Sequence, residues 1–500
     1  MSYSRVLFCA LVAAVVTSGC GGGGGGSLTR GTLPQSAGSP SPSASPSHSP
    51  SPAPSPTGPL AILKHVLTAD YCCGGYANET PAGGVASAQP WLTYFANPSA
   101  NSDPTGTYPS YGAPGLAAAG VSPSRVYTYV DDSRIYRGDA QFNNIAPGGA
   151  QATAEAVDCF GNPITVNNQN GYLSDPWQLA TLQIYDADVT QKFTASTEFG
   201  VVFLDDIGAY QFVDNNAVAC ENGIPWTGMS AAPAYAVIIN GINVSGLGGH
   251  APPAYLLNVL APVLIEANGS SATLQAMITD FASLTNVVAM DCEGCLADNH
   301  NAEIGNSTPF DVANQWILAE DAEIVAVNAQ KIFWLQDQDS TSTGAASYAG
   351  RIYAYASFML TWDPVYTVYQ NDYYGYPGDG MHPNSRTPQI HVFPEEGLVA
   401  YNPVVAYPSN ASGIGALKDA GGTYFREYQN CYNQGTGIGA CAFVVNPDSL
   451  SHPAPTMHGT YTHTMALNNQ LDVLSGGTIA TNGAAMPSTI PGLTGYVLLP

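Results

Sequence analysis

The chain has 500 residues and a formal net charge of −25, because 37 Asp and Glu residues face only 12 Lys and Arg residues. So few cations argue against nucleic acid and anionic membranes as partners, since both are bound through basic surfaces. The length exceeds that of one average domain, so we expect one large domain and one smaller domain.

The N-terminus has the pattern of an export signal. Arg5 precedes an apolar run over residues 6–16, and small residues then lead to Cys20. The pattern is typical of a secretory signal and resembles that of a bacterial lipoprotein, with Cys20 as the lipidated residue. Thr17 stands where that motif usually has an aliphatic residue. We predict a signal over residues 1–20 and an exported protein, either lipid-anchored in the cell envelope or extracellular.

The next segment, residues 21–59, is predicted to be a tether. It begins with a run of glycine over residues 21–26, and Ser and Pro dominate residues 39–59. Neither composition can form a hydrophobic core, so we expect a flexible part followed by an extended one. The folded part is predicted to begin near Leu60.

Apolar runs typical of strands alternate with helical spacing from residue 60 onward. The predicted strands are residues 62–68, 125–130, 154–158, 201–204, 235–239, 287–290, 331–335 and 358–360. Helices are indicated over residues 177–193 and by the spacing of Leu274, Met277, Ile278 and Phe281. Eight strands separated by helices predict an α/β fold, a (β/α)8 TIM barrel over residues 60–420. The rival doubly wound sheet usually has a Gly-rich turn after its first strand, and residues 70–74 do not form one.

Short alternating runs follow residue 420, over residues 424–428, 442–446, 459–467 and 496–499. Gly, Pro and Asn separate them, which is typical of antiparallel strands joined by turns. We expect a small antiparallel, sandwich-like β domain over residues 421–500.

Two of the predicted strands end in carboxylates. Residues 201–204 run into Asp205 and Asp206, and residues 287–290 are followed by Asp291 and Glu293. The carboxyl ends of barrel strands form the active-site face, so these acids are catalytic candidates; capping of the following turn is an equal alternative for the first two. Glycoside hydrolysis needs one acid to protonate the leaving oxygen and one carboxylate to attack the sugar or activate water.

Other polar and aromatic residues follow the remaining predicted strands. We expect Asn240, Asp337 and Asp363 to bind substrate hydroxyls, with helix capping as an equal alternative for Asp337. Tyr366 opens a tyrosine-rich stretch that suits the faces of sugar rings, or that packs against itself.

The cysteines indicate disulfides, because an even number remains beyond the signal and export leads to an oxidising compartment. Cys431 and Cys441 flank a turn-rich loop and are the best pair. Cys292 and Cys295 form a C-x-x-C beside Glu293, which we interpret as a local staple because no helix follows. A zinc site would need a second ligand pair, and only residues 72–73 offer one. We therefore expect no metal and no cofactor.

The stretches FLDDIG, MDCEG and ASFMLTWDP, together with the C-terminal runs, resemble a family of glycoside hydrolases with TIM barrels and a small C-terminal β domain. The resemblance covers most of the chain from residue 60 and implies a barrel of the α-galactosidase-like type. It implies that Asp205 is the nucleophile and Glu293 the acid/base, with Asp206 and Asp291 competing for these roles. The cysteines around Glu293 depart from the apolar residues expected there.

The resulting prediction is an exported glycoside hydrolase that acts on a neutral oligosaccharide or polysaccharide. Asp205 and Glu293 are the catalytic residues, and the substrate-binding residues are Asp206, Asn240, Asp291, Asp337, Asp363 and Tyr366. The alternative is a non-catalytic cell-surface lipoprotein that binds carbohydrate on the same barrel; a purely structural envelope lipoprotein would need neither carboxylate. Carboxyl groups about 5 Å apart would predict retention of configuration, and about 6.5–9.5 Å inversion.

Overall fold

The structure is a computed structural model. It describes residues 66, 93–96, 120–131, 134–137, 142–146, 148–166, 168–194, 199–205, 207, 214–244, 251–260, 263–264, 270–293, 295–296, 313–339, 345–373, 400–433, 437–466, 480–481 and 484–500. The predicted signal and tether, with Cys20, lie outside these ranges.

A parallel sheet of seven strands forms the larger part of the fold. Its order is β1-β2-β6-β9-β10-β11-β12, and every neighbouring pair is parallel. The strands are β1 (Phe95–Ala96), β2 (Val126–Asp131), β6 (Val201–Asp205), β9 (Ala254–Asn258), β10 (Val287–Glu293), β11 (Ile332–Asp339) and β12 (Thr367–Tyr373). The order in space is the order in the chain, so the sheet does not reverse its winding as a doubly wound sheet does.

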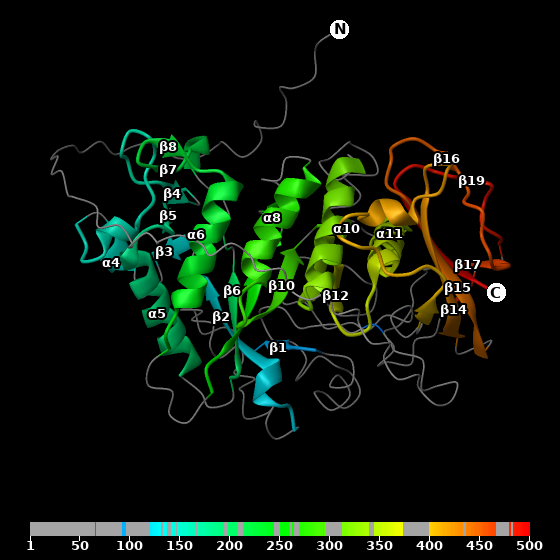
Figure 1. Cartoon of the computed structure of the whole chain (residues 1–500), viewed down its shortest axis with the longest axis horizontal. Coiled ribbons are helices and arrows are strands. Elements are labelled where there is room, and N and C mark those ends of the chain that lie inside the picture. The colour runs from blue at the N-terminus through cyan, green and yellow to red at the C-terminus, as the bar shows by residue number, and fades with distance from the viewer. Residues whose placement is uncertain are drawn as a thin grey trace, which may run out of the picture.

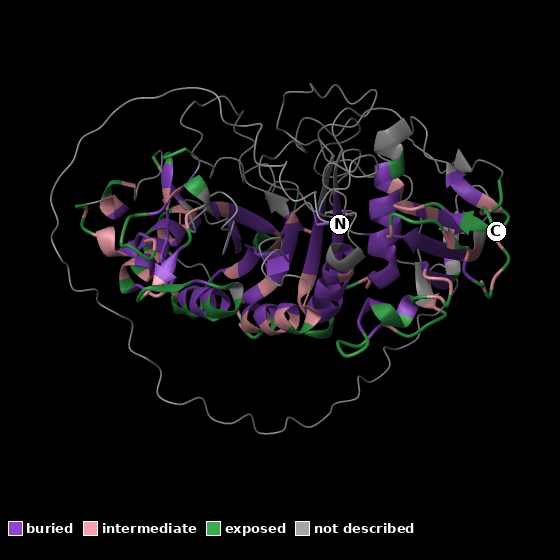
Figure 2. Ribbon diagram, turned by 90° about the horizontal axis from the view of Figure 1, so that it is seen from above, coloured by how far each residue is buried: buried purple, intermediate pink, exposed green. Residues whose placement is uncertain are grey.

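In the described ranges these strands are connected by five helices: α5 (Leu179–Phe193), α6 (Gly228–Gly241), α8 (Ser271–Ala282), α10 (Ala313–Asn328) and α11 (Ala345–Thr361). Right-handed crossovers in a sheet of ascending order place every helix on the same face. The helices lie side by side in chain order (Figure 1). In the view from above α5, α6, α8 and α10 line one side of the row of strands, and α11 stands at the end of that row (Figure 2). This is the winding of a TIM barrel. Among the described residues no pairing joins β12 back to β1, so the closed barrel of eight strands stays a prediction.

The two faces of the sheet have separate cores because side chains alternate along a strand. On β6, Val202 and Leu204 pack with the helices in the main core, whereas Val201 and Phe203 belong to a second cluster on the opposite face. Asp205 continues the second series. The face turned away from the helices, here called the inner face, therefore carries the strand-end carboxylate.

Aromatic rings fill the inner face below its polar end. Phe203 lies between Tyr127 and Trp334, with ring centroids 5.5 and 5.6 Å away, and Tyr94 stacks on Trp334 at 6.5 Å. Trp334 Nε1 donates to Oε1 of Gln370 on the neighbouring strand at 3.1 Å. The polar residues of the inner face thus stand on a packed aromatic floor.

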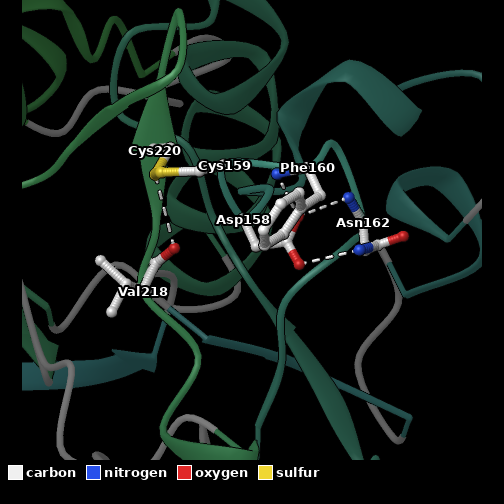
Figure 3. The surroundings of a disulfide bond; sticks show 6 residues. All are labelled: Asp158, Cys159, Phe160, Asn162, Val218 and Cys220. Atoms are coloured by element: carbon white, nitrogen blue, oxygen red, sulfur yellow. Dashed lines mark hydrogen bonds between the residues drawn. A yellow bond between two sulfur atoms is a disulfide. The ribbon is translucent and has the colours of Figure 1, made fainter.

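An insertion follows the carboxyl ends of β2 and β6, at one end of the row of helices (Figure 1). It contains a three-stranded sheet, a hairpin and short helices: β3 (Arg134–Tyr136), β4 (Thr165–Val166), β5 (Gly171–Leu173), β7 (Cys220–Glu221), β8 (Ile224–Pro225), α4 (Phe142–Ile145), η4 (Ala152–Ala154) and η5 (Asp214–Asn216). The short helix η3 (Pro123–Arg125) lies outside the insertion, because it directly precedes β2. A disulfide between Cys159 and Cys220 joins its two segments (Figure 3). Next to it, Oδ1 of Asp158 accepts from the backbone N of Phe160 and of Asn162 at 2.9 and 2.8 Å, which fixes the turn.

A six-stranded sheet of antiparallel pairs lies at the other end of the molecule, in the order β13-β14-β15-β20-β17-β18. The C-terminal elements are β13 (Ala400–Pro403), η6 (Ile414–Leu417), β14 (Tyr424–Asn433), β15 (Gly437–Asn446), β16 (His452–Pro453), β17 (His463–Ala466), β18 (Ala480–Thr481), β19 (Thr489–Ile490) and β20 (Thr494–Leu499). All four strands predicted for this region are present. The sheet also includes β13, which precedes residue 421, where the second domain was predicted to begin.

Helix α11 is enclosed between the two sheets. The ring of Tyr355 lies 5.7 Å from that of Tyr369 in the parallel sheet and 5.9 Å from that of Phe443 in the antiparallel sheet. On β20, Gly495 allows close approach, because a Cβ there would meet Cα of Tyr353 at 2.8 Å. The two sheets consequently share one hydrophobic core through this helix.

Half of the strands predicted for the barrel are confirmed, namely those at residues 125–130, 201–204, 287–290 and 331–335. Residues 235–239 and 358–360 were wrongly predicted as strands and lie in α6 and α11. Residues 154–158 do not join the sheet either, and 62–68 lie outside the described residues except for Val66, which is buried. Helix α11 is buried on several faces, so its apolar run resembles that of a buried strand. In α6 the run is unbroken because Val237, on the exposed face, is apolar as well.

Candidate active site

Asp205 and Glu293 both lie on the inner face at the carboxyl ends of their strands. Asp205 ends β6 and Glu293 ends β10, and β9 runs between these two strands. Asp205 is 4% exposed, whereas Glu293 is partly exposed. The structure therefore places these two acids at one end of the sheet; their catalytic roles stay a prediction.

Asn258, the last residue of β9, bridges the two carboxylates. Its Nδ2 donates to Oδ1 of Asp205 at 2.7 Å and to Oε2 of Glu293 at 2.9 Å. The sum of these distances, about 5.6 Å, is the largest separation that the two acceptor oxygens can have. Such a limit is compatible with the carboxyl spacing of about 5–5.5 Å found in retaining glycosidases.

Tyr129 holds the other oxygen of Asp205. Its phenol donates to Oδ2 of Asp205 from the neighbouring strand β2, so both carboxylate oxygens of Asp205 accept hydrogen bonds. The ring of Tyr129 stacks on Phe203, with centroids 5.9 Å apart, and thus rests on the aromatic floor. Asp205 is held from both neighbouring strands.

Further polar residues extend this row across the sheet. Asp291, in register with Asn258, precedes Glu293 by two residues on the same face and is 1% exposed. Gln336 of β11 is in register with Glu293, and Gln370 of β12 is in register with Gln336. The inner face therefore carries a band of carboxylates and amides, in which Gln336 and Gln370 are buried like Asp291.

The structure separates three of the predicted binding residues from this band. Asn240 is exposed near the end of α6, because the run before it is helical. Asp363 lies between α11 and β12, where its Oδ1 accepts from the backbone N of Val365 and of Tyr366 and closes a turn. Tyr366 precedes β12, and its backbone O accepts from Phe333 near the start of β11. Asp363 and Tyr366 are thus at the opposite, amino-terminal edge of the sheet.

Two predicted binding residues remain, Asp206 and Asp337. Asp206 lies outside the described residues. Asp337 follows Gln336 on β11, opposite Asn371 of β12, so its backbone is at the carboxyl end of the sheet as predicted. Tyr369, from the tyrosine-rich stretch, is buried in the main core rather than part of a loop.

Sequence reasoning missed Asn258 and Tyr129. Asn258 follows the apolar run Tyr255, Leu256 and Leu257, which is the same pattern that singled out Asp205, so the signal was present. Tyr129 occupies an alternate position of a confirmed strand, but nothing in the sequence distinguishes it from other strand tyrosines. Its role depends on the register of β2 against β6.

Disulfides were predicted correctly. Cys292 pairs with Cys295 around Glu293, and Cys431 pairs with Cys441 in the antiparallel sheet. With Cys159–Cys220 there are three in the described part of the chain, which is compatible with an exported protein. The first pair closes a short loop that contains Glu293, and both of its cysteines are buried.

The described residues include neither a metal-binding cluster nor a membrane-spanning helix. No group of three His, Cys, Asp or Glu side chains there is arranged to hold a metal ion. No helix in the same ranges is long and apolar enough to cross a membrane.

No protein-family model matches the sequence, and no curated protein matches it. Solved structures with weak likeness include a pullulanase from Bacillus acidopullulyticus, with 11% identity and a TM-score of 0.28 over 77% of this chain and 47% of the pullulanase. A maltogenic alpha-amylase from Thermotoga neapolitana has 8% identity and a TM-score of 0.31 over 77% and 78% of the two chains. A trehalose-6-phosphate hydrolase from Bacillus licheniformis has 12% identity and a TM-score of 0.34 over 77% and 84%. TM-scores this low do not decide the fold or the function of this chain.

Proposed function

We propose that this protein is an exported glycoside hydrolase that cleaves a neutral glycan with retention of configuration. The observation that carries the proposal is the bridge of Asn258 between Asp205 and Glu293, which limits two of their oxygens to about 5.6 Å apart. Retaining hydrolysis uses two carboxyl groups about 5–5.5 Å apart, and the limit set by the bridge is compatible with that spacing.

In the proposed first step, a carboxylate oxygen of Asp205 bonds to the anomeric carbon while the bond from that carbon to the leaving oxygen breaks. Glu293 transfers its proton to the leaving oxygen. In the second step a water attacks the same carbon, Glu293 takes the proton of that water, and Asp205 departs as a carboxylate. The proton balance closes over the two steps, and no cofactor is required.

The surroundings of the pair support a sugar as the substrate. The amides of Gln336 and Gln370 and the carboxylate of Asp291 lie on the same face, beside the aromatic floor. The scarcity of Lys and Arg disfavours an anionic substrate. We further propose that the sheet closes into a TIM barrel around this face and that the signal over residues 1–20 exports the protein, with a lipid anchor if Cys20 is modified.

The test is turnover of neutral oligosaccharides, α-galactosides among them, by the parent protein, Asp205→Asn and Glu293→Gln. NMR of the first product should show the anomeric configuration of the substrate, and both variants should lose turnover while they still bind. Inverted product would overturn the retaining assignment. Binding without turnover, equal in all three proteins, would instead favour the non-catalytic carbohydrate-binding alternative.

A further inference from the structure

Asp205 and Glu293 are close enough to affect each other's charge. Two carboxyl groups at such a distance tend to share a proton, because the first negative charge disfavours the second. The proposed reaction instead needs one of them ionised and the other protonated at the same pH. The side chain between them is Asn258.

The amide of Asn258 has one chemically reasonable orientation. A single terminal atom lies within hydrogen-bond distance of both carboxyl groups, and an amide oxygen there would lie against Oδ1 of the ionised Asp205 with no hydrogen between them. The atom is therefore the nitrogen, which donates one hydrogen to each acid. The backbone O of Asn258 also accepts from N of Ile207 at 3.0 Å, which ties the end of β9 to the chain just beyond Asp205.

We propose that Asn258 is a positioning residue that keeps Asp205 and Glu293 in separate roles; this inference rests on the proposed function. Its bond to Oε2 of Glu293 makes that oxygen an acceptor, so the transferable proton is carried on Oε1. Its second hydrogen and the phenol of Tyr129 bind one oxygen each of Asp205. Donors to both oxygens favour the ionised carboxylate, as a nucleophile requires.

The sharpest variant is Asn258→Asp, which keeps the shape of the side chain and replaces both donors by acceptors. Three carboxyl groups then meet, and their mutual repulsion raises the pKa of at least one of them in the folded protein. The folded protein therefore keeps a proton at pH values where the unfolded chain has released it. Stability relative to the parent should therefore fall as the pH rises above the ordinary carboxyl range of about 4. Adding Glu293→Gln returns a donor between positions 258 and 293 and should restore most of the loss.

The first experiment measures thermal unfolding midpoints of the full chain between about pH 4 and about pH 8. It compares the parent, Asn258→Asp, Glu293→Gln and the double variant. Asn222→Asp is the matched control, because it adds the same charge at an exposed turn between β7 and β8. If Asn258→Asp does not fold, the cycle of Asn258→Ala with Glu293→Gln measures the same coupling. Additive effects of the two substitutions would overturn the proposal.

The second experiment measures kcat and KM. Asn258→Ala should lower kcat about 10²-fold with little change in KM, the effect of misplaced reacting groups. Asn258→Asp should move the pH of maximum rate upward. The substitutions at positions 258 and 293 can have non-additive effects on stability while the parent turns over no glycan. That result would overturn the proposed function but support the amide bridge. Turnover in the parent with an unchanged kcat in Asn258→Ala would overturn the positioning role alone.

Discussion

The phenol of Tyr129 donates a hydrogen bond to Oδ2 of Asp205, through the oxygen that Asn258 does not bind. Tyr129→Phe removes this donor and keeps the ring on Phe203. A hydrogen bond to a charged group contributes about 1.5–3 kcal/mol, so kcat should fall about 10- to 100-fold. Steady-state kinetics measures the loss, and thermal unfolding measures the accompanying loss of stability. An unaltered kcat would mean that this bond does not orient the nucleophile.

Leaving groups should separate the roles of the two acids. Glu293→Gln removes the proton donor, so turnover of an unactivated glycan should fall about 10²–10⁴-fold. The same variant should be partly spared on aryl glycosides whose leaving group needs little protonation. Asp205→Asn should be inactive on both kinds of substrate, because the nucleophile is missing. Equal losses on both kinds of substrate in Glu293→Gln would refute its assignment as the acid.

The disulfide beside the site should affect activity, and the distant one stability. The double variant Cys292→Ser with Cys295→Ser frees the chain just after Glu293, so we expect a lower kcat. The matched variant, Cys431→Ser with Cys441→Ser, opens a hairpin in the antiparallel sheet and should lose about 2–3 kcal/mol of stability without a change in kcat. Kinetics and urea unfolding of both variants check this. The reverse pattern would contradict the placement of Glu293 in the site.

Glu155 in the insertion predicts a pH dependence. Burial raises the pKa of its carboxyl to about 7. Because this pKa is higher in the folded than in the unfolded chain, the destabilisation is absent below about pH 4.5 and grows as the pH rises toward 7. Glu155→Gln should leave the unfolding midpoint unchanged at low pH and raise it above neutrality.

Glu427 is the matched control for Glu155, with the opposite sign. Burial raises the pKa of Glu427, but hydrogen bonds from the backbone N of Gly459 and of His458 outweigh it and leave the pKa lowered. Its stabilisation is present above the unfolded pKa and is lost as the pH falls. Glu427→Gln should therefore lower the midpoint at neutral pH and have little effect in acid. Parallel behaviour of the two variants would contradict both assignments.

Arg426 should hold the two sheets together. It is buried, and its Nη1 donates to the backbone O of Leu360 and of Trp362 at 2.9 and 3.1 Å, at the end of α11. Burial raises the pKa of the nearby Glu323, and the charge of Arg426 opposes that shift. Arg426→Met keeps the apolar stem but breaks a buried charged cluster, which typically costs about 3–5 kcal/mol. Urea unfolding should show this loss. Arg137→Met removes one exposed hydrogen bond to the backbone O of Gln169 and a cation–π contact with Phe142, so it should cost only about 1 kcal/mol.

The sequence alone was enough wherever one local pattern excluded the alternatives. A short apolar run that ends in acids identified β6 and β10 and with them Asp205 and Glu293. Amphipathic spacing identified α8, because the side chains of one helix face are buried in the core and those of the other face are more exposed to solvent. The buried residues are Leu274, Met277, Ile278 and Phe281. Close cysteine pairs identified two of the disulfides, since their partners are near in the chain.

Tertiary structure alone decided what depends on a second layer of packing or on register between strands. Helix α11 reads as a strand because a sheet covers it on either side and little of its surface remains polar. The apolar runs of α6 and α11 resemble strands, so the sequence predicts Asn240 and Asp363 at strand ends. Asn258, which does end a strand, is not among the predicted residues. The bridge from Asn258 to both carboxylates arises because β9 lies between β6 and β10, and strand order is a property of the folded sheet that no local stretch of sequence encodes.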